Sequence, residues 1–153
     1  MLFRSIARMD TKAAPESIIE ATQFTETHDL ILQLSEGYDT QIGGRGHHLS
    51  AGQRQRIALA RAFYGEPKVV VLDEPNANLD TEGESALFRT IQRAKEKHIT
   101  TVIISHKPDI LNLADYILVL QQGEAKVFDQ RDKVLSLLRK DASQKQIQTT
   151  QQT

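Results

Sequence analysis

Two runs of β-branched residues with one amphipathic segment between them constrain the fold of this chain most. The runs are KVVVL at 68–72 and ITTVIIS at 99–105, and each is typical of a strand buried on both faces. Between them, residues 81–97 place Leu87 and Ile91 on one side of a predicted helix. The order strand, helix, strand predicts a parallel sheet with a right-handed crossover, so the expected fold class is α/β.

The segment before the first strand, about residues 15–63, is predicted to be mainly helical. Apolar residues recur at helical spacing in PESIIEATQF and HDLILQL, and the glycine-rich stretch EGYDTQIGGRGHH separates them from a further helix. That helix is expected to begin near Ser50, a favourable N-cap residue. Beyond the second strand, residues 116–121 and 125–129 flank a Gly-Glu turn and predict a hairpin, followed by a short helix over 132–140.

The chain of 153 residues has the usual length of one domain. We expect a folded part over residues 1–140, made of the helical segment at about 15–63 and a core part at about 67–140. The stretch DASQKQIQTTQQT at 141–153 is polar and low in complexity, which predicts a disordered tail.

Composition excludes several classes of function. Apolar residues make up 39% and charged residues 25%, which is typical of a soluble globular chain, and the formal net charge of −1 gives no reason to expect a nucleic-acid partner. There is no cysteine, so a disulfide framework and a thiolate metal site are excluded. No apolar run approaches the roughly 18–20 residues of a membrane span, and the start MLFRSIARMDTK has no signal-peptide core of adequate length. We therefore expect the chain by itself to be soluble and any membrane association to come through a partner.

Two adjacent carboxylates, Asp73 and Glu74, follow the first predicted strand in VVVLDEP. They are expected at the carboxyl edge of a parallel sheet, where ligands bind in open α/β folds. Asp73 is suited to hold Mg²⁺, usually through water, and Glu74 is suited to polarise an attacking water as a general base. A solvated acidic turn after the strand is the alternative.

The stretch LSAGQ stands where the helix near Ser50 is predicted to begin. Small residues there let backbone N–H groups approach an anion, and the helix N-terminus adds a partial positive charge. Ser50 can add a hydroxyl donor, and Gly52 permits close backbone approach. An ordinary N-cap, with Gln53 in a capping-box position, explains the same residues.

Two further motifs follow in order along the chain. NANLD ends at Asp80, which is equally suited to cap the helix beginning near Thr81 and to act in a site. IISH places His106 just beyond the second strand, where a lone histidine is more often a surface or capping residue than a catalytic one.

In this order the motifs LSAGQRQRIALARA, VVVLDEP, NANLD and IISH resemble those of the ATP-binding cassette (ABC) ATPases. LSAGQ is similar to the signature motif, with alanine where glycine is commoner, VVVLDE to Walker B with its adjoining glutamate, NANLD to the D-loop and SH to the H-loop. The resemblance covers roughly residues 2–140 and is most specific to the protease and haemolysin exporters of bacterial type I secretion. It implies the C-terminal part of a P-loop NTPase (RecA-like) cassette, with a mainly helical signature subdomain at the N-terminal side.

The resemblance implies ATP and Mg²⁺ as cofactors and ATP hydrolysis coupled to export as the activity. It assigns Glu74 as the general base, Asp73 to Mg²⁺ and His106 as the sensor of the γ-phosphate. Contacts with the nucleotide of a partner cassette, and signalling across the dimer, fall to Ser50, Ala51, Gly52, Gln53 and Asp80. The implied partners are a second cassette in a head-to-tail dimer and a transmembrane exporter domain. That arrangement puts the chain at the cytoplasmic face of the bacterial inner membrane.

The sequence departs from the family at the phosphate-binding loop, which needs Gly-x-x-x-x-Gly-Lys-Ser/Thr. None of its eight glycines is followed by lysine, and no glutamine precedes Gln23, so the Q-loop is missing as well. We expect the isolated chain to bind ATP poorly and to be inactive, because the lost contacts are charge-assisted hydrogen bonds. We also expect an uncovered sheet edge and face, and hence marginal stability or aggregation.

Three alternatives stay open. The cassette could serve a lipid or drug exporter, because these motifs contact ATP and not the cargo. The chain could be a non-catalytic fragment or relict, a truncated reading frame or one part of a split cassette. A nucleic-acid-maintenance ATPase with an ABC-type head is the third, although such heads usually carry long coiled-coil insertions and more basic surfaces.

Overall fold

The computed structural model describes residues 1–42 and 49–150, with side chains as far as residue 140. The chain divides into two compact units, Met1–Ser105 and His106–Thr153. The helical segment and the first two strands belong to the same unit, so the boundary expected near residues 63–67 separates parts of one unit.

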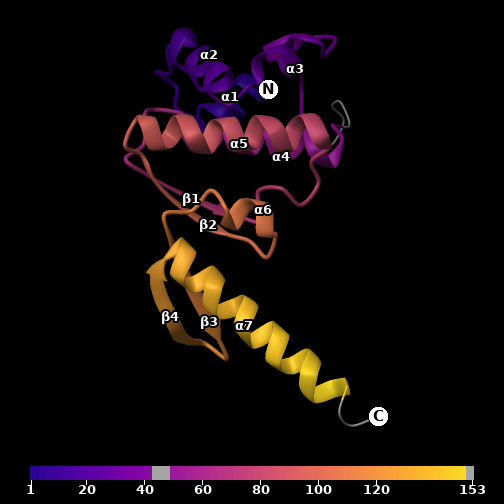
Figure 1. Ribbon diagram of the computed structural model, residues 1–153. Coiled ribbons are helices and arrows are strands. Elements are labelled where there is room, and N and C mark those ends of the chain that lie inside the picture. Colours follow the sequence, from indigo (N-terminus) through magenta and orange to yellow (C-terminus); the bar gives the residue numbers. More distant parts are fainter. Residues whose placement is uncertain (43–48, 151–153) are drawn as a thin grey trace. The chain divides into compact units, whose positions relative to one another are not determined.

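The first unit begins with helical elements: α1 (Leu2–Ile6), α2 (Pro15–Phe24), α3 (His28–Leu32), the 3₁₀ turn η1 (Gly37–Asp39) and α4 (Ala51–Phe63) (Figure 1). The apolar spacing predicts α2, α3 and α4. Pro15 opens α2 at the position where proline's fixed φ suits a helix start. Helix α1 had no counterpart among the expected elements. The GGRGHH part of the predicted glycine-rich loop lies outside the described residues.

These helices share one apolar core. Its buried members come from the segments before and along α4: Leu2, Ile6, Ala7, Ile18, Ile31, Leu49, Ile57 and Ala60. Residues 57 and 60 lie one helical turn apart, so the inner face of α4 forms part of this core. The start of α4 is therefore held in place by the short helices that precede it.

The predicted strand–helix–strand unit is present as β1 (Val69–Asp73), α5 (Thr81–Glu96) and β2 (Thr100–Ile104). The two strands are parallel, and the last residue of β1, Asp73, pairs with Ile104 at the end of β2. Helix α5 buries Leu87 and Ile91 completely or almost so. The α/β fold class with a parallel sheet is confirmed.

The prediction that both strands are buried on both faces is wrong. In β1, Val70 and Leu72 are buried, but the residues between them are exposed. The exposed face consists of Val69 (59% exposed), Val71 (62%), Val102 (48%) and Ile104 (53%). Among the described residues each strand has one partner strand, and helices contact the sheet through α4 and α5. The runs of β-branched residues therefore predict where the two strands lie, but not how many faces of their sheet are covered by other elements.

Replacing Val71 with threonine is expected to weaken self-association of the chain and leave its unfolding free energy almost unchanged. Val71 is 62% exposed on an apolar face beside unpaired strand edges, which favour pairing with another chain. The same substitution at Val70, which is 4% exposed, should instead destabilise the fold by about 1–3 kcal/mol, since it buries a hydroxyl. Sedimentation velocity and urea unfolding measure the two effects, and unchanged association of Val71→Thr would contradict this assignment.

The second unit consists of α6 (Pro108–Leu111), β3 (Tyr116–Gln121), β4 (Glu124–Gln130) and α7 (Arg131–Thr150). Strands β3 and β4 pair antiparallel, which confirms the predicted hairpin. Its turn contains Gly123 at φ 80°, a conformation that favours glycine.

The predicted short helix over 132–140 and the disordered tail over 141–153 need correction. Helix α7 begins at Arg131 and continues to Thr150. The stretch after residue 140 contains no glycine or proline, and its commonest residue is glutamine, a good helix former. Residues 151–153 lie outside the described residues.

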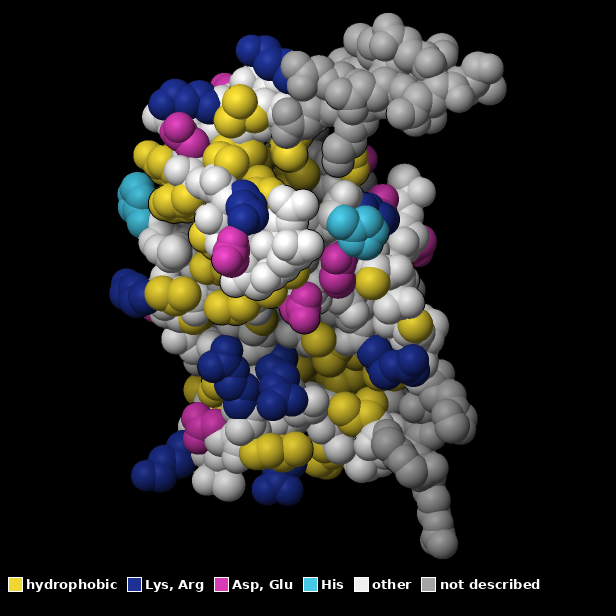
Figure 2. All heavy atoms as spheres, turned by 90° about the horizontal axis from the view of Figure 1, so that it is seen from below, with side chains coloured by type: hydrophobic (Ala, Val, Ile, Leu, Met, Phe, Trp, Pro, Cys, Tyr) yellow, Lys and Arg dark blue, Asp and Glu magenta, His cyan; other side chains and the backbone are white. Residues whose placement is uncertain are grey.

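Within the described ranges, no helix combines the length and the apolar character needed to span a membrane. Large apolar side chains of the second unit are exposed on the hairpin: Tyr116, Leu118, Leu120 and Phe128. Figure 2 shows one face of the molecule, on which hydrophobic side chains reach the surface among lysine and arginine side chains. The exposed apolar surface of this unit thus includes a β-hairpin.

Candidate functional site

The start of α4 carries the LSAGQ residues, and its geometry is a capping box. The Ser50 Oγ accepts a hydrogen bond from the Gln53 N–H at 3.1 Å, and the Ser50 N–H donates to Gln53 Oε1 at 2.8 Å. The N-cap alternative is therefore what this structure contains. Ser50 remains exposed with its hydroxyl proton available, because in the cap that oxygen accepts.

Gly52, on the first turn of α4, lies against the backbone that follows β1. A Cβ atom at Gly52 would lie 2.7 Å from the carbonyl oxygen of Asn78, closer than side-chain carbons come to such atoms. Ala51, one residue earlier, is exposed. The absence of a side chain at Gly52 thus lets the LSAGQ and NANLD motifs touch within one unit.

Asp73 and Glu74 lie at the carboxyl end of β1, as predicted. Asp73 is exposed, whereas Glu74 is half-buried. Glu74 has φ 42°, in the left-handed region that few non-glycine residues adopt. Its N–H donates to the Ile104 carbonyl at 2.9 Å, and its own carbonyl accepts from the Ala77 N–H at 3.1 Å. The end of β2 and a tight turn therefore fix this backbone.

Asp80 caps α5. Its Oδ1 accepts from the Gly83 N–H at 2.8 Å, the pattern expected for an aspartate N-cap. Asp80 stands two residues after Asn78, whose carbonyl lies against Gly52, and its carboxylate is engaged at the start of α5.

His106 is exposed and is the first residue of the second unit. It follows β2 by two residues, as the IISH motif predicts. The other predicted site residues all belong to the first unit. They lie at the start of α4 (Ser50, Ala51, Gly52 and Gln53), at the end of β1 (Asp73 and Glu74) and just before α5 (Asp80).

Two polar residues of this region were not singled out from the sequence. Gln55 donates from Nε2 to the carbonyl oxygen of Glu74 at 3.2 Å. Asn76 is 2% exposed, and its Oδ1 accepts from the Ser105 hydroxyl at 3.4 Å, while its Nδ2 is buried with no partner in the described structure. The spacing of Gln55, three residues after Gly52, is a signal for the same helix face.

A cluster of arginines surrounds Glu26, the residue between α2 and α3 that has φ 55°. Arg89 donates from Nε to Glu26 Oε1 at 2.8 Å, and Arg93 from Nη2 to the same oxygen at 2.7 Å. Arg56 donates to the Glu26 carbonyl at 2.6 Å, and Arg93 also donates to the carbonyl of Phe24 at 3.0 Å. These bonds link the short helices to α4 and to α5.

The hydrogen bond from Arg89, supported by Arg93, lowers the pKa of Glu26 below its ordinary value of 4.5 against the opposing effect of burial. A lowered folded-state pKa means that the unfolded chain takes up the proton first. The stabilisation is therefore fully present above pH 4.5 and is lost as the pH falls through the folded-state pKa.

Glu26→Gln is expected to lower the free energy of unfolding by about 1 kcal/mol at pH 7, since Arg89 and Arg93 are 49% and 39% exposed and water screens the pair. The difference from the unsubstituted chain should shrink at pH values below 4.5. Urea unfolding at several pH values measures it, with Glu20→Gln on an exposed face of α2 as the matched control. A difference that persists in acid would show that the charge of Glu26 is not responsible.

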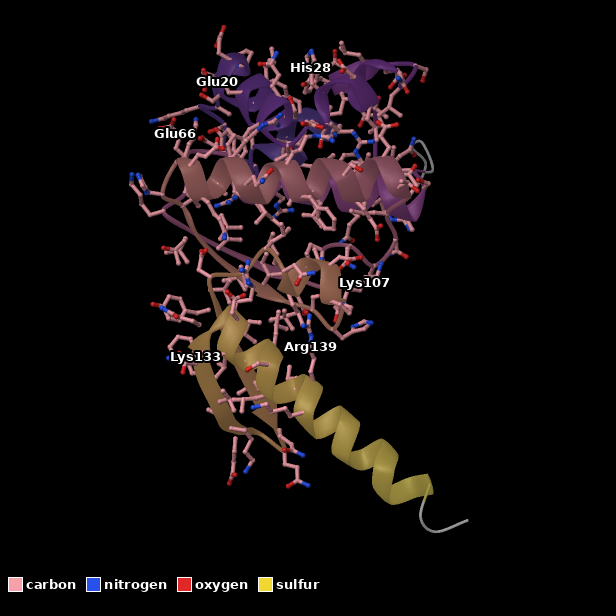
Figure 3. The ribbon with its side chains drawn as sticks, in the orientation of Figure 1. Glu20, His28, Glu66, Lys107, Lys133 and Arg139 are labelled. Atoms are coloured by element: carbon pink, nitrogen blue, oxygen red, sulfur yellow. The ribbon has the colours of Figure 1, made fainter. Side chains whose placement is uncertain are left out.

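A cavity of about 850 Å³ lies at the opposite end of β1. It is lined by residues of α2, of the turn after α4 and of the segment before β2, among them Glu20 and Glu66 (Figure 3) and the aromatic pair Phe24 and Phe63. Lys68, the residue before β1, also lines it, so this cavity is separate from the carboxylates at the other end of the strand.

Two adjacent carboxylates, those of Asp73 and Glu74, are the candidate metal donors at the carboxyl end of β1. Within residues 1–42 and 49–140, no three histidine or carboxylate side chains gather as a metal cage. Mg²⁺ in phosphate-binding sites takes one or two carboxylates and completes its shell with waters and phosphate oxygens. Asp73, exposed at the strand end, is suited to that role.

Comparison with known proteins agrees with this geometry. The ABC transporter family model matches residues 4–77. A type I secretion system ATP-binding protein of Rhizobium meliloti, PrsD, is 45% identical over 132 residues, which is 86% of this chain and 23% of the relative. A putative multidrug export ATP-binding/permease protein of Staphylococcus aureus is 39% identical over 111 residues, 72% of this chain and 19% of the relative.

A solved structure of a bacterial Atm1-family ABC exporter with ATP bound superimposes with a TM-score of 0.77 at 35% identity, covering 92% of this chain and 24% of that chain. This chain thus spans about a quarter or less of the length of the proteins it matches. The carboxylates after β1, the capped start of α4 and these similarities lead to one assignment: the chain belongs to the ABC transporter ATPase family.

Proposed function

We propose that this chain supplies the signature motif and the catalytic carboxylates of an ATP-hydrolysing cassette in a bacterial type I protein-secretion exporter. One observation supports this most. The backbone after Asp73 and Glu74 lies against the start of α4 at Gly52, so the residues that resemble Walker B and the signature motif are neighbours in this fold. The 45% identity to a type I secretion ATP-binding protein favours that class of exporter.

In the proposed reaction, Glu74 accepts a proton from the water that attacks the terminal phosphorus of ATP, and ADP leaves with the bridging oxygen. A carboxylate held close to that water contributes roughly 10²–10⁴-fold to the rate. Asp73 would hold Mg²⁺, which when bound neutralises charge on the phosphates. His106 is proposed as the γ-phosphate sensor from its position after β2 in the chain.

The LSAGQ residues act toward a second cassette in this proposal. The exposed Ser50 and the N–H groups of Ala51, Gly52 and Gln53 lie at a helix start, which favours an anion such as the γ-phosphate bound by the partner cassette. Asp80, which caps α5, is proposed to transmit that contact across a head-to-tail dimer. A transmembrane exporter domain would hold the pair at the cytoplasmic face of the inner membrane.

A glycine-rich loop must come from a segment that this sequence does not contain. The 153 residues include no Gly-Lys pair, and the loop amides and lysine would otherwise contact the β- and γ-phosphates. We propose that such a segment completes the site and that the chain alone binds ATP weakly. The exposed face of β1 and β2 is apolar, as a surface that receives further strands and helices should be.

A second function has support from one observation. The 39% identity to putative multidrug export proteins favours a drug exporter with the same chemistry at Glu74.

The experiment joins the full chain to a cassette segment that carries Gly-x-x-x-x-Gly-Lys-Ser/Thr from a type I secretion ATPase and measures phosphate release from Mg-ATP. Hydrolysis is expected from the joined protein and is expected to disappear when the loop lysine becomes alanine. A joined protein that melts cooperatively and hydrolyses nothing would refute the catalytic role. Secretion of a type I substrate, against efflux of a drug, by an exporter carrying this cassette distinguishes the two exporter classes.

A further inference from the structure

A side chain of α4, the helix that begins with the signature motif, donates a hydrogen bond to the backbone of Glu74, the proposed general base. Gln55, half-buried on α4, donates from Nε2 to the Glu74 carbonyl oxygen at 3.2 Å, across 19 residues of sequence. We infer that Gln55 is a positioning residue for Glu74. The catalytic role of Glu74 rests on the proposed function, whereas the hydrogen bond from Gln55 to Glu74 is present without ATP.

Glu74 needs such support because of its backbone. At φ 42° it occupies a region that L-residues rarely adopt unless their surroundings hold them there. Its N–H is held by Ile104 of β2, and its carbonyl receives both the Ala77 N–H and the Gln55 amide. The peptide groups on both sides of the Glu74 side chain are thereby fixed, and they set the direction in which the carboxylate leaves the chain.

The contact with α4 is made twice. Gly52 and Gln55 lie three residues apart, so they share one face of the helix, and Gly52 abuts the carbonyl of Asn78 at a distance that excludes a side chain. The segment from Glu74 to Asn78 therefore contacts the first turns of α4 at both of its ends, by a hydrogen bond at Glu74 and by close backbone packing at Asn78. A nucleotide bound at Ser50 of this chain would act on the same helix that holds Glu74.

The turn after β1 also has a hydrogen bond that does not involve α4. Asn76 is buried and accepts from Ser105, which follows β2. That bond ties the turn to the sheet, whereas Gln55 ties it to the signature helix. Removing the Gln55 amide should loosen the link to the signature helix and leave the bond between Asn76 and Ser105 in place. This difference makes the role of Gln55 testable.

The test uses amide hydrogen exchange, read residue by residue by NMR, on the full chain. Gln55→Met keeps the length of the side chain and the helix propensity but removes the donor. We expect the Ala77 and Glu74 amides to exchange about tenfold faster, the loss of roughly one hydrogen bond, while Leu87 in α5 is unchanged. Gln55→Lys, which keeps a donor, should restore most of the protection. Gln92→Met, at an exposed position of α5, is the matched control.

Unchanged exchange at Ala77 and Glu74 in Gln55→Met would overturn the inference, as would equal acceleration at Leu87, which reports loss of the whole fold. In the protein completed with a glycine-rich loop, Gln55→Met is expected to lower kcat about tenfold with the KM for ATP unchanged. If that protein hydrolyses no ATP while the exchange effect is present, the proposed function fails and the placement of Glu74 by Gln55 stands.

Discussion

Glu74→Gln is expected to reduce ATP hydrolysis by roughly 10²–10⁴-fold in the chain completed with a glycine-rich loop segment. Glutamine has the shape of glutamate and leaves the backbone bonds of residue 74 to Ile104, Ala77 and Gln55 in place. It cannot accept the proton of the attacking water at neutral pH. The rate of phosphate release at saturating Mg-ATP measures the effect, and nucleotide affinity should change little.

Glu66→Gln is the matched control, because Glu66 is an exposed carboxylate beside the cavity at the other end of β1. Its rate should equal that of the unsubstituted protein. A Glu74→Gln rate within a few-fold of that value would mean that another group takes the proton, and the role given to Glu74 would be wrong.

Leu87→Ala is expected to lower the free energy of unfolding by about 2–5 kcal/mol. The Leu87 side chain is 0% exposed on the face of α5 that packs toward the sheet, so the substitution leaves a cavity beneath the helix. Alanine is the best helix former, so helix propensity does not oppose the measurement. Urea unfolding followed by circular dichroism gives the difference.

The same substitution at Leu32 provides the comparison. Leu32 ends α3 and is 58% exposed, so Leu32→Ala should change the unfolding free energy by no more than about 0.5 kcal/mol. Equal losses at the two positions would show that α5 does not form the cover of the β1–β2 sheet that the fold requires.

Local signals in the sequence were sufficient to predict the strands and the starts of α4 and α5. Ser50 and Asp80 each precede a helix, and each side chain makes the cap that its residue type favours. The capping alternative and the functional assignment describe the same positions, because a helix start with an open N-terminus both needs a cap and attracts an anion. Sequence reasoning alone had no means of separating the two.

Features that depend on distant segments were not predictable in this way. Val69 and Val71 are exposed because no helix covers that face of the sheet among the described residues, and a run of β-branched residues does not indicate which faces are covered. The bond from Gln55 to Glu74 spans 19 residues, and the pair Glu26–Arg89 spans 63. Helix α7 continues beyond residue 140, where the polar, repetitive composition predicts disorder although the segment has no helix-breaking glycine or proline.

Titration of the purified chain with a fluorescent ATP analogue and Mg²⁺, alone and joined to the glycine-rich loop segment, tests the central claim most directly. The claim is that this chain holds the signature and carboxylate parts of the site and needs the loop from elsewhere. It predicts no saturable binding below millimolar concentration for the chain alone and micromolar binding for the joined protein. Micromolar binding by the chain alone, weakened by Ser50→Ala, would contradict it, because the signature face would then recruit nucleotide without the loop.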